Sequence, residues 1–241
     1  MGVNKMIRVF IGFDPNETVA YHVCAHSIMK RASQPVSITP INMGNLREFN
    51  RDKGEGSTEF SFSRFLTPYL AGYSGQAVFM DCDMLVNCDI VELFQLNQGH
   101  YDVMVVKHDY TPKTETKFLG NKQHVYPKKN WSSLMLFNCD NYPCKKLNPD
   151  TVTKATGKYL HQFEWTTEAR IGEIPKEYNH LVGEYEPNPD AKIIHYTLGT
   201  PCFAGYETQE WADEWYRELR DMNHAAGLSD RMFPFQDHED A

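Results

Sequence analysis

The sequence contains no apolar run that approaches the ~18 consecutive residues of a membrane span. Its first residues also lack the pattern of a signal-peptide cleavage site, so we expect a cytoplasmic protein. The six cysteines are scattered, with no C-x-x-C pair and no zinc-ligand spacing. In a chain of 241 residues this distribution favours reduced thiols over a disulfide framework.

The sequence also has fewer basic than acidic residues, 24 against 32, so its formal net charge is −8. This balance argues against a nucleic-acid partner, which normally requires an electropositive footprint. One segment is an exception, with six lysines against only Asp109 and Glu115: Lys107, Lys113, Lys117, Lys122, Lys128 and Lys129. Such a segment either attracts a phosphate or is a solvated loop, and the sequence leaves both interpretations open.

The chain opens with an alternation of strand and helix patterns. Residues 7–13 are β-branched and aromatic, residues 17–32 carry apolar positions at helical spacing, and residues 35–43 return to an extended pattern. Further on, residues 62–70 place apolar side chains on one helical face. With 41% hydrophobic residues, the chain is expected to form one α/β domain over residues 1–241.

A pair of aspartates follows a short apolar strand at residues 77–80. Side chains two apart on extended backbone point the same way, so Asp81 and Asp83 project together while Cys82 turns towards packing. Ligands of open α/β sheets collect at the carboxyl ends of strands, and paired carboxylates suit Mn²⁺ or Mg²⁺. A D-x-D pattern alone is weak evidence, however, because aspartate is common wherever a strand gives way to a turn.

A histidine lies near the end of the last expected strand, residues 192–196, which precedes the loop of residues 197–201. An isolated histidine in such a place is usually a hydrogen-bonded structural residue. Imidazole also suits manganese when it is joined to carboxylates. We therefore expect His195 to share one ion with Asp81 and Asp83.

Four stretches together resemble the retaining glycosyltransferases of family 8 and their bacterial and viral relatives, which have the GT-A fold. They are residues 9–17 (VFIGFDPNE), residues 63–65 with 78–86 (SRF and VFMDCDMLV), residues 131–138 (WSSLMLFN) and residues 195–201 (HYTLGTP). The resemblance implies a single GT-A domain with a Rossmann-like mixed sheet flanked by helices. It also implies a nucleotide-binding part at about 1–106 and an acceptor and sugar part at about 107–241.

The resemblance implies roles for individual residues. Asp81, Asp83 and His195 would ligate Mn²⁺ or Mg²⁺, which stabilises the diphosphate leaving group of a nucleotide-sugar donor. Arg64 would lie near the donor phosphate or sugar, although an arginine on an amphipathic helix is also an ordinary surface residue. The other expected substrate contacts are Asp14 near the base of a uridine-diphosphate sugar, and Asn16, Ser132, Ser133 and Gly199.

The sequence departs from the family in three places. Thr200 stands where better-known members carry a diphosphate-binding lysine, so Lys107, Lys128 or Lys129 would have to supply the charge. Residues 131–133 replace Asn-Ala-Gly, which leaves the donor sugar open. No clean D-Q-D segment is present, and Glu164, within residues 162–165, is the nearest substitute for one of its carboxylates.

Retention allows two mechanisms. Glu164 would be the nucleophile of a covalent glycosyl-enzyme; otherwise the acceptor attacks the face that the leaving group vacates, with the protein orienting groups and screening charge. We favour the second mechanism.

A glycan or lipid-linked acceptor suits this chemistry. The aromatic C-terminal stretch, comprising Trp211, Trp215, Leu219, Phe233 and Phe235, either touches a membrane or packs on the core, and packing is the usual fate of an apolar helical stripe. Two other functions stay open. A nucleotidyltransferase would be expected to carry a glycine-rich phosphate loop, which is absent from the sequence; a catalytically silent nucleotide-sugar-binding protein is the second.

Overall fold

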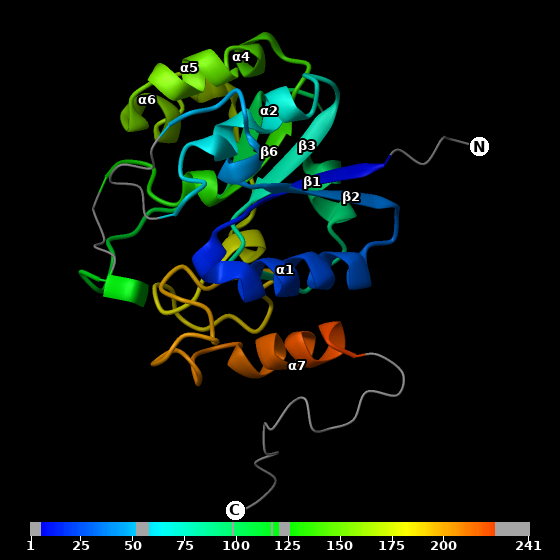
Figure 1. The fold of residues 1–241 in the computed structure, drawn as a ribbon, viewed down its shortest axis with the longest axis vertical. Helices are drawn as coiled ribbons and strands as arrows, with labels where there is room; N and C mark the ends of the chain where they lie inside the picture. The colour runs from blue at the N-terminus through cyan, green and yellow to red at the C-terminus, as the bar shows by residue number, and fades with distance from the viewer. Residues whose placement is uncertain (1–5, 52–57, 98, 117, 121–125, 225–241) are drawn as a thin grey trace, which may run out of the picture.

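The computed structural model describes residues 6–51, 58–97, 99–116, 118–120 and 126–224. Its main feature is a six-stranded mixed sheet in the order β2-β1-β3-β6-β5-β7 (Figure 1). These strands are β1 (Ile7–Gly12), β2 (Val36–Ile41), β3 (Gln76–Met80), β5 (Val103–Val105), β6 (Leu134–Asn138) and β7 (Ile171–Glu173). Strand β6 runs antiparallel to both of its neighbours, and the other pairs are parallel. The expected α/β domain with a mixed sheet is confirmed.

A second, three-stranded sheet lies beside the first, in the order β4-β9-β8. It consists of β4 (Met84–Val86), β8 (His180–Leu181) and β9 (Ile193–His195). Strand β9 pairs antiparallel with β4 and parallel with β8. Since β4 begins only four residues after the last residue of β3, the short connection 81–83 joins the two sheets.

Helices flank the main sheet on two sides. Figure 1 shows α1 (Thr18–Arg31) under the sheet and α7 (Ala212–Met222) beyond it, in contact with α1. On the other side lie α4 (Tyr142–Lys145), α5 (Pro149–Lys154) and α6 (Gly157–His161). The two remaining α-helices in the described chain are α2 (Thr67–Leu70) and α3 (Val91–Leu96).

The C-terminal apolar stripe packs on the protein core. Trp215 is buried in a cluster with Val23 of α1 and Ile194 of β9, and Trp211 and Leu219 pack against the same cluster. The packing interpretation is therefore confirmed for these residues, whereas Phe233 and Phe235 lie outside the described residues. In the part of the chain that is described, none of the helices has the length and apolar character needed to cross a membrane.

The expected helix at residues 62–70 is broken into a 3-10 turn at Ser63–Leu66, followed by the short helix α2. Proline at position 68 lacks the N–H that would continue the helical hydrogen bonds. The carbonyl of Arg64 instead accepts hydrogen bonds from the backbone and hydroxyl of Thr67. Arg64 is only 6% exposed, so the interpretation of this residue as an ordinary surface arginine is wrong.

A close approach at the end of β1 provides a test of the fold. A Cβ atom added to Gly12 would lie 2.4 Å from ring atoms of Phe60, a buried side chain. We expect Gly12→Ala to destabilise the protein by about 1–3 kcal/mol, the usual cost of overpacking a core. Gly157→Ala is the matched control, because its Cβ would meet only ordinary contacts at 3.5 Å. Urea unfolding of both variants measures the difference, and equal stabilities would contradict the packing described.

Candidate metal centre

The connection between the two sheets carries both aspartates of the D-x-D motif. The backbone N–H of Asp81 donates to the carbonyl of Ser133 at 2.9 Å, which extends the pairing of β3 with β6 by one residue. The carbonyl of Asp83 accepts from the N–H of Tyr196 at 2.9 Å, which extends the pairing of β4 with β9. Cys82, between them, is fully buried in the core. The main chain therefore fixes both carboxylates from two different sheets.

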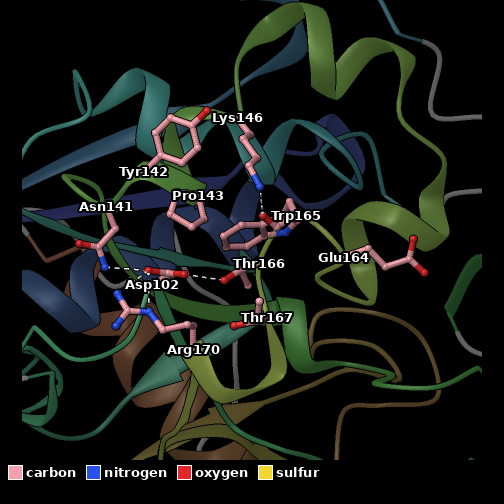
Figure 2. A pocket seen from close by; sticks show the side chains of 10 residues that line it. All are labelled: Asp102, Asn141, Tyr142, Pro143, Lys146, Glu164, Trp165, Thr166, Thr167 and Arg170. Atoms are coloured by element: carbon pink, nitrogen blue, oxygen red, sulfur yellow. Dashed lines mark hydrogen bonds and ion pairs between the residues drawn. The ribbon is translucent and has the colours of Figure 1, made fainter.

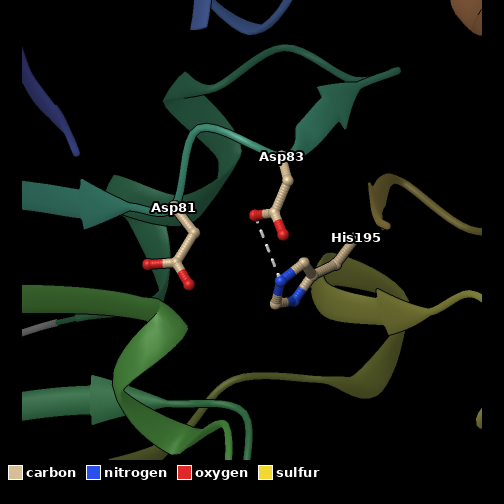
Figure 3. Close-up of side chains that lie close together, drawn as sticks. All are labelled: Asp81, Asp83 and His195. Carbon is tan, nitrogen blue, oxygen red and sulfur yellow. Dashed lines mark ion pairs between the residues drawn. The ribbon is translucent and has the colours of Figure 1, made fainter. Parts of the chain in front are cut away.

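Strand pairing also places the histidine. His195 lies opposite Met84 in the β4–β9 register, so its side chain comes next to Asp83, and its Nε2 atom lies 3.3 Å from Asp83 Oδ1. One ligand atom from each of Asp81, Asp83 and His195 lies within 4.8 Å of the others. Figure 3 shows the three side chains pointing towards one another. The expected juxtaposition of these residues is present.

The cluster fits a divalent cation in chemistry and size. Two carboxylates and one imidazole suit Mn²⁺, and also Mg²⁺ completed by water and phosphate oxygens. Metal–oxygen bonds of about 2.1 Å would set opposite ligands about 4.2 Å apart, close to the observed spread. The thiol of Cys82 is not part of this cluster, because it lies in the apolar core with its Sγ atom 3.9 Å from Glu17 Oε2. Burial raises its pKa well above the ordinary value, and the charges of Glu17, Asp83 and Asp81 raise it further.

An arginine balances part of this negative charge. Arg64 Nη1 lies 2.9 Å from Asp81 Oδ1 and donates to the carbonyl of Ser132 at 3.0 Å. Both side chains of the ion pair are nearly buried, with exposed fractions of 7% for Arg64 and 12% for Asp81. Such pairs are screened little by solvent. Arg64 is thus part of the same site as the aspartates.

The two serines expected to contact a sugar lie next to Arg64, His161 and Asn179. Ser132 Oγ is 2.8 Å from Nδ1 of His161, a residue at the end of α6. Ser133 Oγ accepts a hydrogen bond from the side-chain amide of Asn179 at 2.8 Å. Both serines are buried, at 5% and 1% exposed. They connect the start of β6 to elements that lie far away in the sequence.

The residues expected at the nucleotide base form a local turn. Asp14 Oδ1 accepts hydrogen bonds from the backbone and side-chain nitrogens of Asn16, each at 2.9 Å. Asp14 Oδ2 accepts from the backbone N–H of Glu59 at 3.1 Å. Asp14 is therefore buried and fixes the loop after β1, whereas Asn16 is exposed.

The loop after β9 offers no positive charge for a diphosphate. The N–H of Gly199 donates to the carbonyl of Tyr196 at 2.8 Å, which closes the turn. Thr200 is fully buried, and its hydroxyl lies 3.1 Å from Cys202 Sγ. The turn therefore holds Thr200 away from solvent.

Three lysines were expected to supply the missing charge, and aromatic rings lie near all of them. Lys128 Nζ forms an ion pair with Glu168 at 2.6 Å and donates to the carbonyl of Gln162. Lys107 Nζ lies 5.8 Å from the centre of the Trp131 ring, and Lys129 Nζ lies 5.4 Å from that of Tyr126. Lys128 is thus engaged with protein groups. Lys117 and Lys122 lie outside the described residues.

Glu164 lines a different pocket, of about 430 Å³. Its carboxylate forms an ion pair with Lys158 at 3.2 Å, and Figure 2 shows it pointing away from Asp102, another residue that lines the pocket. Asp102 pairs with Asn138, which lies opposite the first residue of β3. The Asp102 side of the pocket is therefore level with the amino end of β3, whereas Asp81 follows its carboxyl end. The structure does not bring Glu164 into the aspartate–histidine cluster.

Sequence reasoning missed two residues of the site, Asn179 and His161. Asn179 Oδ1 lies 2.9 Å from Nδ1 of His195, and its amide nitrogen contacts Ser133. Neither residue belongs to a recognisable motif, since both reach the site only through long-range packing. A buried polar residue between two strands leaves no periodic signal in the sequence.

The burial of His161 gives a pH-dependent contribution to stability. Burial, together with the charges of Arg64 and Arg51, lowers the pKa of His161 to about 3. Between about pH 6.5 and pH 3 this histidine is therefore protonated in the unfolded chain but neutral in the native chain. The free energy of unfolding consequently falls as the pH drops through this range. We expect His161→Gln to flatten urea-derived stability against pH by about 1.4 kcal/mol per pH unit between pH 6 and 4. An unchanged slope would contradict this assignment.

No protein-family model matches the chain. Solved structures share its fold: the bifunctional glycosyltransferase WbbM, at a TM-score of 0.63 and 15% identity over 90% of this chain, and the glycosyltransferase GlyE of Streptococcus pneumoniae, at 0.59 and 14% over 90%. The chain spans about half of the WbbM chain and 60% of GlyE. The galactosyltransferase LgtC matches at a TM-score of 0.55 and 11% identity, over 92% of this chain and 98% of LgtC. These likenesses show the GT-A glycosyltransferase fold.

A curated relative is much more similar in sequence. Protein CDI of Arabidopsis thaliana is 48% identical over 228 residues, which cover 91% of this chain and 88% of that protein. Such identity over nearly the whole length of both chains implies a common structure as well as common descent. This chain belongs to the same family as Protein CDI.

Proposed function

We propose that this protein is a metal-dependent glycosyltransferase. It transfers a sugar from a nucleotide-diphosphate donor, a uridine-diphosphate sugar, to a glycan or lipid-linked acceptor with retention at the anomeric carbon. The observation that carries the proposal is the cluster of Asp81, Asp83 and His195 at the joint of the two sheets. The GT-A fold of the chain supports it, as does the LgtC structure, which was solved with donor and acceptor sugar analogues.

The three clustered side chains would hold Mn²⁺ or Mg²⁺. When bound, this cation neutralises the diphosphate of the donor and makes it a better leaving group. The main-chain hydrogen bonds of Asp81 and Asp83 fix the ligands before the donor arrives. Charges that are fixed in advance do not have to reorganise when the transition state forms. Such preorganised electrostatic stabilisation is usually the largest single contribution to catalysis.

Arg64 would bind the donor beside the metal. Its guanidinium group has five N–H donors in a planar fork, most of which contact Asp81, Ser132, Phe60 and Thr58. In our proposal the remaining donor, on Nη2, binds a phosphate or sugar oxygen. This role would supply the positive charge that Thr200 lacks, with Lys107 and Lys129 as further candidates.

The two parts of the chain would divide the substrates. Residues 1–106 contribute Asp14 and Asn16 for the nucleotide, together with Arg64 and the aspartates. Residues 107–241 contribute Ser132, Ser133 and Gly199 towards the sugar, and His195 towards the metal. The main sheet contains strands from both parts, so they form one domain whose site lies at their junction.

Retention would proceed by attack on the face that the leaving group vacates. The surroundings of Glu164 support this choice over a covalent intermediate, because its carboxylate pairs with Lys158 and is not part of the aspartate–histidine cluster. In this mechanism the departing phosphate accepts the proton of the acceptor hydroxyl. The protein orients the two substrates and screens charge.

Calorimetric binding of uridine diphosphate, with and without Mn²⁺, tests the donor site. We expect binding to the native chain only when Mn²⁺ is present, and its loss in Asp81→Ala/Asp83→Ala, which removes two of the metal ligands. Asp150→Ala/Asp190→Ala is the matched control. It removes the same charge from two exposed positions and should bind normally. Metal-independent binding, or equal binding by both double variants, would contradict the proposed site.

Product analysis separates this function from the other two. Incubation with a panel of nucleotide sugars and Mn²⁺ should release a nucleoside diphosphate. Release of pyrophosphate from nucleoside triphosphates would instead indicate a nucleotidyltransferase. Tight binding of a nucleotide sugar with no turnover on any acceptor would indicate a silent binding protein.

A further inference from the structure

A line of buried polar groups runs from a backbone carbonyl to the candidate metal ligand His195. Ser133 Oγ donates to the carbonyl of Asn130 at 2.7 Å. The side-chain nitrogen of Asn179 donates to Ser133 Oγ at 2.8 Å, and Asn179 Oδ1 lies 2.9 Å from Nδ1 of His195. Residues 133, 179 and 195 are each at most 1% exposed, so bulk water does not compete for these bonds.

The direction of every bond in this line is determined by its first member. A carbonyl can only accept, so the single hydroxyl proton of Ser133 points to Asn130. The serine oxygen must then accept from the NH₂ group of Asn179, which turns the amide oxygen towards His195. Since an amide oxygen only accepts, His195 Nδ1 must carry a proton. Its Nε2 atom is the one that faces Asp83, at 3.3 Å.

The 3-10 turn at Trp131–Ser133 also positions Asp81, another of the proposed ligands. The carbonyl of Ser133 accepts the backbone N–H of Asp81 at 2.9 Å, while its hydroxyl orders the amide that contacts His195. The side chain of Asn130 donates to Tyr110 at 2.8 Å and to Thr197, two residues beyond His195, at 3.3 Å. Residues 130–133 thus connect the D-x-D motif that follows β3 with the end of β9.

We propose that Asn179 is a positioning residue. It holds His195 in the tautomer with a proton on Nδ1, which leaves the lone pair of Nε2 free to ligate a divalent cation. This inference rests on the metal site of the proposed function and adds to it a residue outside the expected ligands. Hydrogen bonds to the second nitrogen of a metal-bound histidine normally fix its ring and tautomer, and their loss typically costs about 10–100-fold in metal affinity.

Mn²⁺ alone is a sufficient probe, because paramagnetic resonance of free Mn²⁺ reports the affinity without any donor. We expect Asn179→Leu to weaken Mn²⁺ binding by about 10–100-fold. Asn179→Asp should largely retain it, because a carboxylate can still accept from Nδ1. The control is Asn141→Leu, which removes an amide that donates to Asp102, level with the amino end of β3. It should bind Mn²⁺ as the native chain does.

A nitrogen NMR experiment reads the tautomer directly in the metal-free native protein. The ring nitrogens of His195, identified by comparison with His195→Gln, should show a protonated Nδ1. In Ser133→Ala, which removes only one hydroxyl, the amide loses its fixed orientation and the Nε2-protonated form should increase. This smaller change also serves if Asn179→Leu does not fold.

The outcomes separate the two proposals. If Asp81→Ala/Asp83→Ala abolishes Mn²⁺ binding while Asn179→Leu binds normally, the metal site holds and the role of Asn179 is overturned. If the native chain does not bind Mn²⁺, the proposed metal site fails. In that case the NMR result still decides the role of Asn179. A neutral His195 protonated on Nε2 would overturn it, and a proton held on Nδ1 only while Asn179 is present would support it.

Discussion

The structure depends on holding two buried carboxylates close together. Asp81 and Asp83 are separated by one residue and are only 9% and 8% exposed. Charges at such depth are unfavourable unless they are paired. Arg64 forms an ion pair with the first at 2.9 Å, and Nε2 of His195 lies 3.3 Å from the second. A buried cluster of like charges is costly for stability, and in our proposal a bound cation offsets this cost.

The scaffold around the cluster explains how these neighbours are kept in place. The small sheet positions His195, and α7 covers that sheet through Trp215 and the hydrogen bond from Tyr196 Oη to the carbonyl of Trp211. Helix α7 is in turn held on α1 by Glu218. This carboxylate is 2% exposed and bonds to His26 at 2.5 Å and Arg31 at 2.8 Å. Helix α7 therefore supports, indirectly, the strand that carries His195.

Local sequence signals predicted the elements that the site is built on. The opening strands, helix α1 and the strand before Asp81 follow from short apolar patterns, and the structure places them within a residue or two of expectation. The D-x-D motif and His195 could be identified because residue types and resemblance point to them. The apolar period at residues 62–70 predicts one helix, because the period continues through Pro68. The missing N–H of Pro68 interrupts the backbone hydrogen bonds of that helix.

Features that depend on tertiary contacts could not be predicted in the same way. Arg64 is buried because Asp81 and the Ser132 carbonyl accept from its donors, and both lie in segments that follow it in the chain, next to β3 and β6. Asn179 reaches His195 only through the pairing of β8 with β9. Glu164 is expected only as the nearest substitute for a carboxylate of the missing D-Q-D segment. Its ion pair with Lys158 of α6 depends on how the chain folds after that helix.

Anomalous X-ray scattering from a crystal grown with Mn²⁺ and uridine diphosphate would locate the cation itself. We expect one strong manganese peak at the joint of the two sheets. Oxygens of Asp81 and Asp83 and Nε2 of His195 should lie about 2.0–2.3 Å from it, as expected for such ligands. A peak bound by other residues would contradict the assignment of this cluster as the metal centre. So would the absence of any peak there in a crystal that contains the bound nucleotide.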